Sequence, residues 1–120
     1  MQSFNYLKPQ DFNIETYLNS LDTDVAVINV SCKGLTYIPS LKRFTNLRRL
    51  DCYNNHLTSL PKLNKNLCHL ECQNNKLTSL PELNKNLKNL TCNNNQLTSL
   101  PELNTGFYGI QYNLQFVNNP

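Results

Sequence analysis

The sequence predicts an α/β solenoid, mostly β, in which a right-handed coil carries one parallel sheet and an N-terminal helix caps the first turn. Three consecutive blocks of 20 residues, 47–66, 67–86 and 87–106, share the frame L-x-x-L-x-C-x-x-N-x-L-T-S-L-P-x-L-N. A short fixed period is typical of repeat architectures, in which one structural unit stacks on its own copies. In addition, apolar and polar residues alternate around each L-x-C, which indicates a strand with one buried face.

Each strand is expected to turn its leucine and cysteine inward. These inward positions are Leu50, Leu70, Leu90, Cys52, Cys72 and Cys92. The following L-T-S-L-P-x-L is too short and too interrupted by proline for a stable helix, so an extended or 3₁₀ return is expected. Strands that recur in one direction pair in parallel, and their crossovers are right-handed.

At 120 residues the chain has the size of one domain, which divides into an N-terminal helical cap and a repeat region. The cap is residues 1–24 and the repeats cover residues 25–120. The individual repeats are 25–46, 47–66, 67–86, 87–106 and a partial repeat 107–120. The first repeat is longer than the others, and we place its two extra residues around Lys42–Phe44.

The cap is predicted to hold a short helix over residues 10–21. Its apolar stripe, at the i, i+3, i+4, i+7 spacing of an amphipathic helix, is Ile14, Tyr17, Leu18 and Leu21. Two starts fit the sequence. Either Pro9 takes the first helical position, with Leu7 packed on Phe12, or Asp11 is the N-cap. In both cases the apolar face covers the open end of the first repeat.

The partial repeat at the C-terminus differs most from the frame. We place Phe107, Ile110 and Tyr112 at its apolar positions, which leaves Leu114 and Phe116 where the other repeats are polar. In this frame Gln115 takes the asparagine position and Val117 the next leucine position. The side chains of Leu114 and Phe116 either fold back as a cap or form an edge through which the chain self-associates.

A pair of adjacent asparagines recurs just after each strand of the 20-residue repeats. The second asparagine of each pair is expected to satisfy backbone groups of its own rung and of the next rung where the chain turns inward, since an amide has two donors and an acceptor. These residues are Asn55, Asn75 and Asn95. The first asparagine of each pair is expected to face solvent and to be the better candidate for contact, namely Asn54, Asn74 and Asn94.

The frame L-x-x-L-x-C-x-x-N-x-L resembles the leucine-rich repeat, and L-T-S-L-P-E-L in a 20-residue unit is similar to its short bacterial-type LPxL class. That class occurs in effector proteins of pathogens and in proteins of large DNA viruses. The resemblance covers Val25 to Val117 and is strongest from Leu47 to Leu103. It implies a curved solenoid with the sheet on its concave face, and protein binding on that face. The ubiquitin-ligase domain and the disulfide-bonded cap of some relatives are missing, so neither enzyme activity nor secretion is expected.

Composition limits the classes of function further. The net charge is +3, with −3 in residues 1–24 and +6 in the remainder, which is milder than a nucleic-acid-binding stripe. Five cysteines without metal-site spacing are expected to be free thiols in a reducing compartment. Neither a signal peptide nor a transmembrane stretch is evident, so a cytoplasmic protein is expected, in the host-cell cytosol if it is an effector or viral protein. No cofactor is expected.

The outward positions of the strands differ between repeats, so any recognition surface is expected there. They are predicted to form three columns, which run Val27, Arg49, His69, Asn89 and Gly109; Asn29, Asp51, Glu71, Thr91 and Gln111; and Ser31, Tyr53, Gln73, Asn93 and Asn113. We predict that a protein partner binds on the concave face at Arg49, Asp51, Tyr53, His69, Glu71, Gln73, Asn89, Thr91 and Asn93. Tyrosine and arginine are the side chains that most often anchor interfaces. We expect a monomer, and neither nucleic acid nor membrane as partner.

Two alternatives belong to other functional classes. Asp51, His69 and Glu71 combine two carboxylates and an imidazole, the groups used in acid–base catalysis or in binding a metal. A shallow, solvated sheet surface argues against that use, because it has no pocket to exclude water. The other alternative is a structural or assembly component that self-associates through its C-terminal edge.

Overall fold

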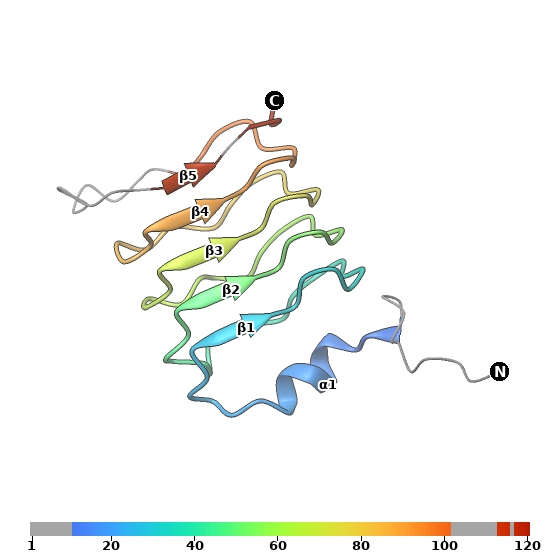
Figure 1. Cartoon of the computed structure of the whole chain (residues 1–120), viewed down its shortest axis with the longest axis vertical. Helices are drawn as coiled ribbons and strands as arrows, with labels where there is room; N and C mark the ends of the chain where they lie inside the picture. Colours follow the sequence, from blue (N-terminus) through green and yellow to red (C-terminus); the bar gives the residue numbers. More distant parts are fainter. Residues whose placement is uncertain (1–10, 102–112, 116) are drawn as a thin grey trace.

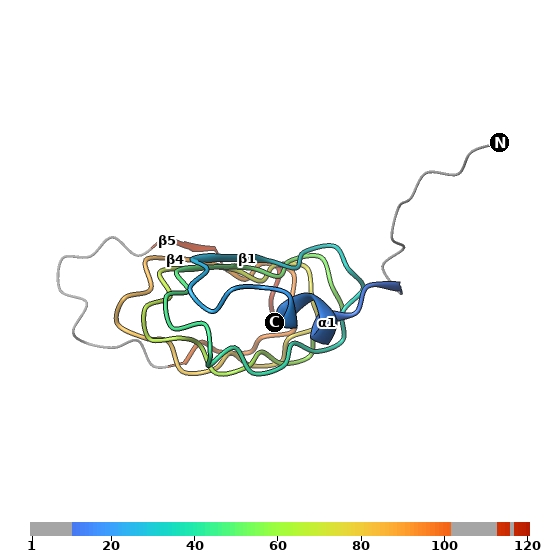
Figure 2. The same cartoon turned by 90° about the horizontal axis from the view of Figure 1, so that it is seen from below.

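The computed structural model describes residues 11–101, 113–115 and 117–120. It holds one helix, α1 (Ile14–Asn19), and a parallel sheet with its strands in chain order. The strands are β1 (Val27–Asn29), β2 (Arg49–Asp51), β3 (His69–Glu71), β4 (Asn89–Thr91) and β5 (Asn113–Gln115). They stack along a right-handed coil, one strand per rung, and the return segments run behind them (Figure 1). Seen along its axis, the coil is flattened, with the sheet on one long side (Figure 2). The predicted solenoid is confirmed.

The register of the first four strands is the one that the repeat predicts. Arg49 pairs with Val27 on one side and with His69 on the other, and His69 pairs with Asn89. The strand leucines Leu50, Leu70 and Leu90 form the adjacent inward column and are fully buried. Leu50 and its equivalents therefore hold the rungs together by contact between identical side chains.

The register of the last rung was predicted wrongly. Asn89 pairs with Asn113 and Leu90 with Leu114, whereas the sequence frame placed Ile110 opposite Leu90. β5 thus starts 24 residues after β4, four more than the repeat length. Leu114 therefore takes the register position that the sequence frame assigned to Ile110, and not the polar position predicted for it. Phe107, Ile110, Tyr112 and Phe116 lie outside the described residues.

The physical reason for the later register lies in Asn119. Its Oδ1 accepts the backbone N–H of Leu97 at 3.0 Å, and its Nδ2 donates to the carbonyl of Cys92 at 2.9 Å. Leu114 and Asn119 also reproduce the spacing of the leucine and the asparagine in the repeat frame. The need to satisfy the turn of the fourth rung outweighs the apolar pattern that starts at Phe107.

The capping helix is shorter than predicted and starts at a different residue. Asn13 is the N-cap, and its Oδ1 accepts the backbone N–H of Thr16 at 2.9 Å. Asp11 therefore does not cap the helix, while Pro9 and Leu7 lie outside the described residues. Ile14 and Leu18 are buried in the core of the first rung. α1 lies across the first turn of the coil, below β1 (Figures 1 and 2).

The cysteines of the frame form a buried column in the core. Cys52, Cys72 and Cys92 have no exposed surface. Burial raises the pKa of each thiol, that of Cys92 to about 11, so these groups stay protonated at neutral pH. A protonated, inaccessible thiol is a poor nucleophile and behaves as a small apolar side chain.

The inner asparagine ladder, Asn55, Asn75, Asn95 and Asn119, ties the turns after the strands. In Asn75, Oδ1 accepts the N–H of Leu57 at 3.0 Å. Its Nδ2 donates to the carbonyls of Cys52 and Cys72 at 3.0 and 3.1 Å. Each inner asparagine therefore completes the hydrogen bonding of its own rung, as predicted, and of the rung before it, whereas the sequence frame led us to expect the next rung.

The outer asparagine ladder runs beside it and consists of Asn54, Asn74, Asn94 and Asn118. These residues have φ between 56° and 62°, the left-handed region that asparagine tolerates better than most residues. Each Nδ2 donates to the Oδ1 of the preceding member, as from Asn74 to Asn54 at 2.6 Å. The predicted exposure of this series is correct, but its side chains are bonded to one another.

A third set of asparagines ties the return segments. Asn64 Nδ2 donates to the carbonyls of Leu41 and Phe44 at 2.9 and 2.8 Å, and Asn84 repeats the contact on Asn64 at 2.7 Å. The recurring N-K-N of the sequence is therefore a rung-to-rung tie that leaves its lysine exposed.

Candidate functional site

The outward side of the sheet, called the sheet face, carries an ion-pair network on β2 and β3. Arg49 Nε donates to both carboxylate oxygens of Asp51 at 3.1 and 2.9 Å, and the guanidinium reaches Glu71 Oε2 at 3.2 Å. His69 Nε2 lies 2.8 Å from the same Glu71 oxygen. Gln73 Nε2 donates to the other Glu71 oxygen, Oε1, at 3.2 Å.

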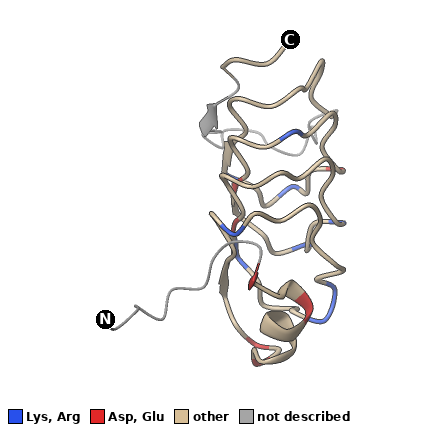
Figure 3. Ribbon diagram, turned by 90° about the vertical axis from the view of Figure 1, so that its right-hand side faces the viewer, with Lys and Arg blue, Asp and Glu red and all other residues tan. Residues whose placement is uncertain are grey.

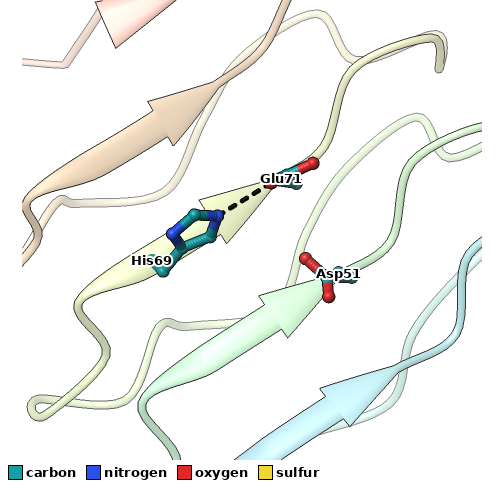
Figure 4. A group of neighbouring side chains, drawn as sticks. All are labelled: Asp51, His69 and Glu71. Carbon is teal, nitrogen blue, oxygen red and sulfur yellow. Dashed lines mark hydrogen bonds and ion pairs between the residues drawn. The ribbon is translucent and has the colours of Figure 1, made fainter. Parts of the chain in front are cut away.

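Strand periodicity and register bring this network together. Because side chains alternate along a strand, Arg49 and Asp51 share the sheet face, as do His69 and Glu71. The parallel pairing then sets Arg49 beside His69 and Asp51 beside Glu71. Figure 4 shows the imidazole of His69 directed along β3 toward Glu71, with the Asp51 carboxylate on the neighbouring strand. The predicted column neighbours are therefore real neighbours.

The electrostatics of the network stabilise its charged forms. The hydrogen bond from His69 holds the pKa of Glu71 below its usual range, helped by Gln73 and by the positive charge of Arg49. The pKa of Arg49 is raised, chiefly by its hydrogen bond to Asp51. Asp51 faces outward as predicted, yet only 8% of its side chain is exposed, because the guanidinium lies across its carboxylate. The Arg49 side chain itself is 42% exposed.

The remaining predicted residues lie around this network and differ in their burial and hydrogen bonding. Tyr53, Asn89 and Thr91 are half-buried on the sheet face. Asn93 is committed to the fold, because its Oδ1 accepts the backbone N–H of Val117 at 2.7 Å. Sequence reasoning placed Asn113 next to Asn93 in its column, whereas the backbone bond from Asn94 to the Val117 carbonyl gives that place to Val117.

Two apolar side chains on the sheet face were not among the predicted site residues. Val27 on β1 is 52% exposed beside the Arg49 column, and Val117 is 64% exposed after β5. Val27 already stood in an outward column of the sequence frame, so its exposure was available as a signal. Val117 was instead expected at the next leucine position of the frame, and its exposure contradicts that prediction because the register of the last rung is shifted.

The geometry also bears on the alternative of a metal or acid–base centre. One ligand atom each from Asp51, His69 and Glu71 lie within 4.8 Å of one another (Figure 4). Carboxylate oxygen and imidazole nitrogen are usual ligands of zinc and similar ions. However, the Arg49 guanidinium already bonds both carboxylates, so a cation must displace it to bind there. The arrangement as it stands is suited to hydrogen bonding and to charge recognition.

The fold and the sheet face together define a class of protein: a leucine-rich repeat coil, a fold that generally serves as a protein–protein interaction module and is typically a non-enzymatic scaffold. No family model and no curated protein matches the chain. Among solved structures, the chain is similar to YopM from Yersinia enterocolitica WA-314, a leucine-rich repeat effector, with 30% sequence identity and a TM-score of 0.57. The chain therefore has the leucine-rich repeat fold that YopM has.

The likeness to YopM covers 71% of this chain but only 23% of YopM, so the chain spans less than a quarter of that protein's length. What the whole of YopM does therefore comes to this chain only as a proposal. Among the described residues, no helix is long and apolar enough to cross a membrane.

Proposed function

We propose that the chain is a non-enzymatic interaction module that binds a protein partner on its sheet face. The residues proposed to contact the partner are Arg49, Asp51, Tyr53, His69, Glu71, Gln73, Asn89, Thr91 and Asn93. The observation that carries the proposal is the ion-pair network, because all three ion pairs of the described residues are gathered at this one place on the outside of the coil.

The network favours recognition because it holds its side chains in place before binding. Arg49 is fixed by Asp51 and Glu71, so a partner that contacts it does not have to immobilise a free arginine. Arg49 and the neighbouring Tyr53 are residue types that anchor interfaces. Val27 and Val117 add exposed apolar surface on the same face.

The charge of the network indicates the chemistry of the partner. Arg49 contributes one positive charge against the two negative charges of Asp51 and Glu71, which leaves a surplus of one negative charge when His69 is neutral. A partner that presents a basic side chain with several N–H donors complements this surplus of negative charge.

The same proposal places the chain in the cytoplasm, in the host-cell cytosol if it acts as an effector, as a monomer that binds neither nucleic acid nor membrane. Cys32, Cys52, Cys68 and Cys72 are free thiols, in keeping with a reducing compartment. The likeness to a leucine-rich repeat effector supports this setting.

Affinity capture from the native host, read out by mass spectrometry, tests the proposal. The test variant combines Arg49→Ala, Tyr53→Ala and Glu71→Ala. The matched control combines His56→Ala, Lys76→Ala and Gln96→Ala, three exposed residues at equivalent repeat positions off the sheet face. We expect the control to retain the partner and the test variant to lose it. Equal capture by both variants would contradict binding on the sheet face.

The spacing of Asp51, His69 and Glu71 supports a metal or acid–base centre as a second candidate. Arg49→Ala separates it from the first, because removing the guanidinium frees both carboxylates. For a metal centre this variant binds Zn²⁺ more tightly than the wild type in calorimetry, whereas for an interaction face it only weakens partner capture. An enzyme at this site predicts an activity that is lost in Asp51→Ala or Glu71→Ala.

The third candidate, self-association through the C-terminal edge, concerns residues that lie largely outside the described ones. Light scattering over a range of concentrations tests it. A mass that stays at that of a monomer supports the interaction module, and a mass that rises to that of a dimer supports the edge.

A further inference from the structure

A groove of about 370 Å³ lies between the first two return segments of the coil. Ser40, Lys42 and Thr45 line it from the first rung, and Lys62 and Lys65 from the second. We call it the lysine groove. It shares no residue with the sheet face, so an inference about it stands independently of the proposed function.

The groove concentrates positive charge that no ion pair among the described residues neutralises. Lys42, Lys62 and Lys65 are exposed, and no acidic residue is among those lining the groove. The ion pairs of the described residues all lie on the sheet face, so none involves these lysines. Basic segments recur in successive rungs of the coil, whereas acidic segments lie around α1 and by the sheet and also occur on the return side (Figure 3). Like charges this close repel one another, and a bound anion relieves the repulsion.

Arg43 differs from the three lysines of the groove because its side chain has partners in the fold. Although it is next to Lys42 in sequence, its guanidinium donates to Asn19 at 3.1 Å and stacks 4.6 Å from the ring centroid of Phe44. Arg43 is therefore held by the cap and by the core of the first rung, whereas the three lysines have no such partner among the described residues.

The two walls of the groove are tied together, so its shape exists before any ligand arrives. Asn64 donates to the carbonyls of Leu41 and Phe44, and Asn66 donates to the carbonyl of Thr45 at 3.2 Å. These bonds fix the backbone on both sides of Lys65. At the other wall, Ser40 Oγ accepts the N–H of Lys42 at 3.3 Å, which leaves its hydroxyl hydrogen free to donate.

We propose that the lysine groove binds a diphosphate group. Lysine ammonium groups bind phosphate as mobile point charges, and the hydroxyls of Ser40 and Thr45 add neutral donors at the same place. Two linked phosphates carry about three negative charges near neutral pH, which matches the three lysines. The volume of the groove falls within the usual range for small-ligand sites. The diphosphate belongs either to free pyrophosphate or to a nucleoside diphosphate.

The next pair of rungs provides an internal comparison. Glu82 stands where the second rung has Lys62, while Lys85 repeats Lys65. The equivalent place one rung further along therefore has a carboxylate in place of an ammonium group. Since the coil accommodates glutamate at that repeat position, Lys62→Glu changes the charge of the groove without disturbing the fold.

Isothermal titration calorimetry with inorganic pyrophosphate tests the assignment, with sulfate as the reference anion at equal ionic strength. We expect saturable one-to-one binding of pyrophosphate, stronger than that of sulfate, and a loss of affinity of about tenfold or more in Lys62→Glu. The matched control is Lys85→Glu, at the same repeat position as Lys65 but outside the groove, and it should bind like the wild type. Thermal denaturation of both variants checks that each remains folded.

Two further titrations identify the source of the diphosphate and the place where it binds. ADP that binds more tightly than pyrophosphate assigns the groove to a nucleotide, and equal affinities assign it to the diphosphate alone. Shifts of the Thr45 and Lys65 amide resonances on titration place the ligand in the groove. Three results would overturn the proposal: equal binding by Lys62→Glu and Lys85→Glu, no preference over sulfate, or a single-stranded oligonucleotide that binds more tightly than pyrophosphate.

Discussion

The inner and outer asparagine ladders run side by side along the coil, one residue apart in sequence. Asn75, in the inner ladder, is 8% exposed and satisfies backbone groups of two rungs. Asn74, in the outer ladder, is exposed and bonds only the side chain of the preceding member and, in turn, of the following one. Asparagine supplies hydrogen bonds to a buried turn in the inner ladder, whereas in the outer ladder it adopts the left-handed backbone conformation.

This contrast separates what a repeat conserves for folding from what it leaves available for recognition. Both ladders are as regular as the leucines, so regularity alone does not reveal which residues meet a partner. The sheet face differs from rung to rung, and the ion-pair network forms there. The differences between rungs therefore point to function, and the identities describe the scaffold.

The largest effect is expected at the inner ladder. Asn75→Ala leaves the N–H of Leu57 and the carbonyls of Cys52 and Cys72 with fewer partners in a buried turn. We expect the free energy of unfolding to fall by about 2–4 kcal/mol. Urea denaturation measures this loss. A loss no larger than that of Asn74→Ala would contradict the distinction between the two ladders.

A smaller loss of stability is expected when a polar group is placed in the buried cysteine column. Cys72→Ser introduces a hydroxyl into a column with no exposed surface and should lower the free energy of unfolding by about 1–3 kcal/mol. Cys72→Ala is the matched control, because it removes the sulfur without adding a polar atom. If serine proved more stable than alanine in urea denaturation, the column would have to contain hydrogen-bond partners that the described residues do not provide.

The stability of the protein should be less sensitive to substitution in the outer ladder. Asn74→Ala loses two exposed side-chain bonds and places alanine at a φ of 59°, which costs about 1–2 kcal/mol. Asn74→Gly loses the same bonds but adopts this φ without strain, so its stability should lie closer to that of the wild type. Equal losses for both variants in thermal denaturation would mean that the side-chain bonds, and not the backbone, determine the effect.

The smallest effect on stability is expected on the sheet face and depends on pH. The native pKa of Glu71 lies below its ordinary value of 4.5, so the unfolded chain takes up the proton first as the pH falls. The stabilisation by this carboxylate is complete above 4.5 and disappears as the pH drops through the native pKa. Glu71→Gln should therefore be slightly less stable than the wild type at neutral pH and equally stable in acid. Solvent screening keeps the difference small. A constant difference at all pH values in urea denaturation would contradict this reading.

The parts of the fold that follow from local pattern were predictable from sequence. The inward column at Leu50, the neighbours Arg49 and His69, and the role of Asn75 all follow from a period of 20 and from strand alternation. The start of α1 could not be predicted from the sequence. Asp11 and Asn13 are both good N-caps, and packing of the helix on the first rung decides between them. The last register was missed because Phe107 begins an apolar pattern that competes with the pairing of Leu114.

The candidate site was predictable in membership but not in detail. The frame placed Asp51 and Glu71 next to Arg49, yet the burial of Asp51 depends on how the guanidinium lies, which no periodicity encodes. The lysine groove was also missed. Lys42, Lys62 and Lys65 come from two rungs, and their proximity depends on the ties made by Asn64 across the return segments.

The directional bonding of the inner ladder has a dynamic consequence. Leu57 receives its hydrogen-bond acceptor from Asn75, Leu77 from Asn95 and Leu97 from Asn119, so each rung is completed by the one after it. The rungs are linked in a chain of nearest neighbours, and such a chain opens from its ends. Amide hydrogen exchange should therefore be slowest in the middle rungs. A protein that lies along the sheet face joins several rungs at once, and its binding should slow exchange even in rungs that it does not touch.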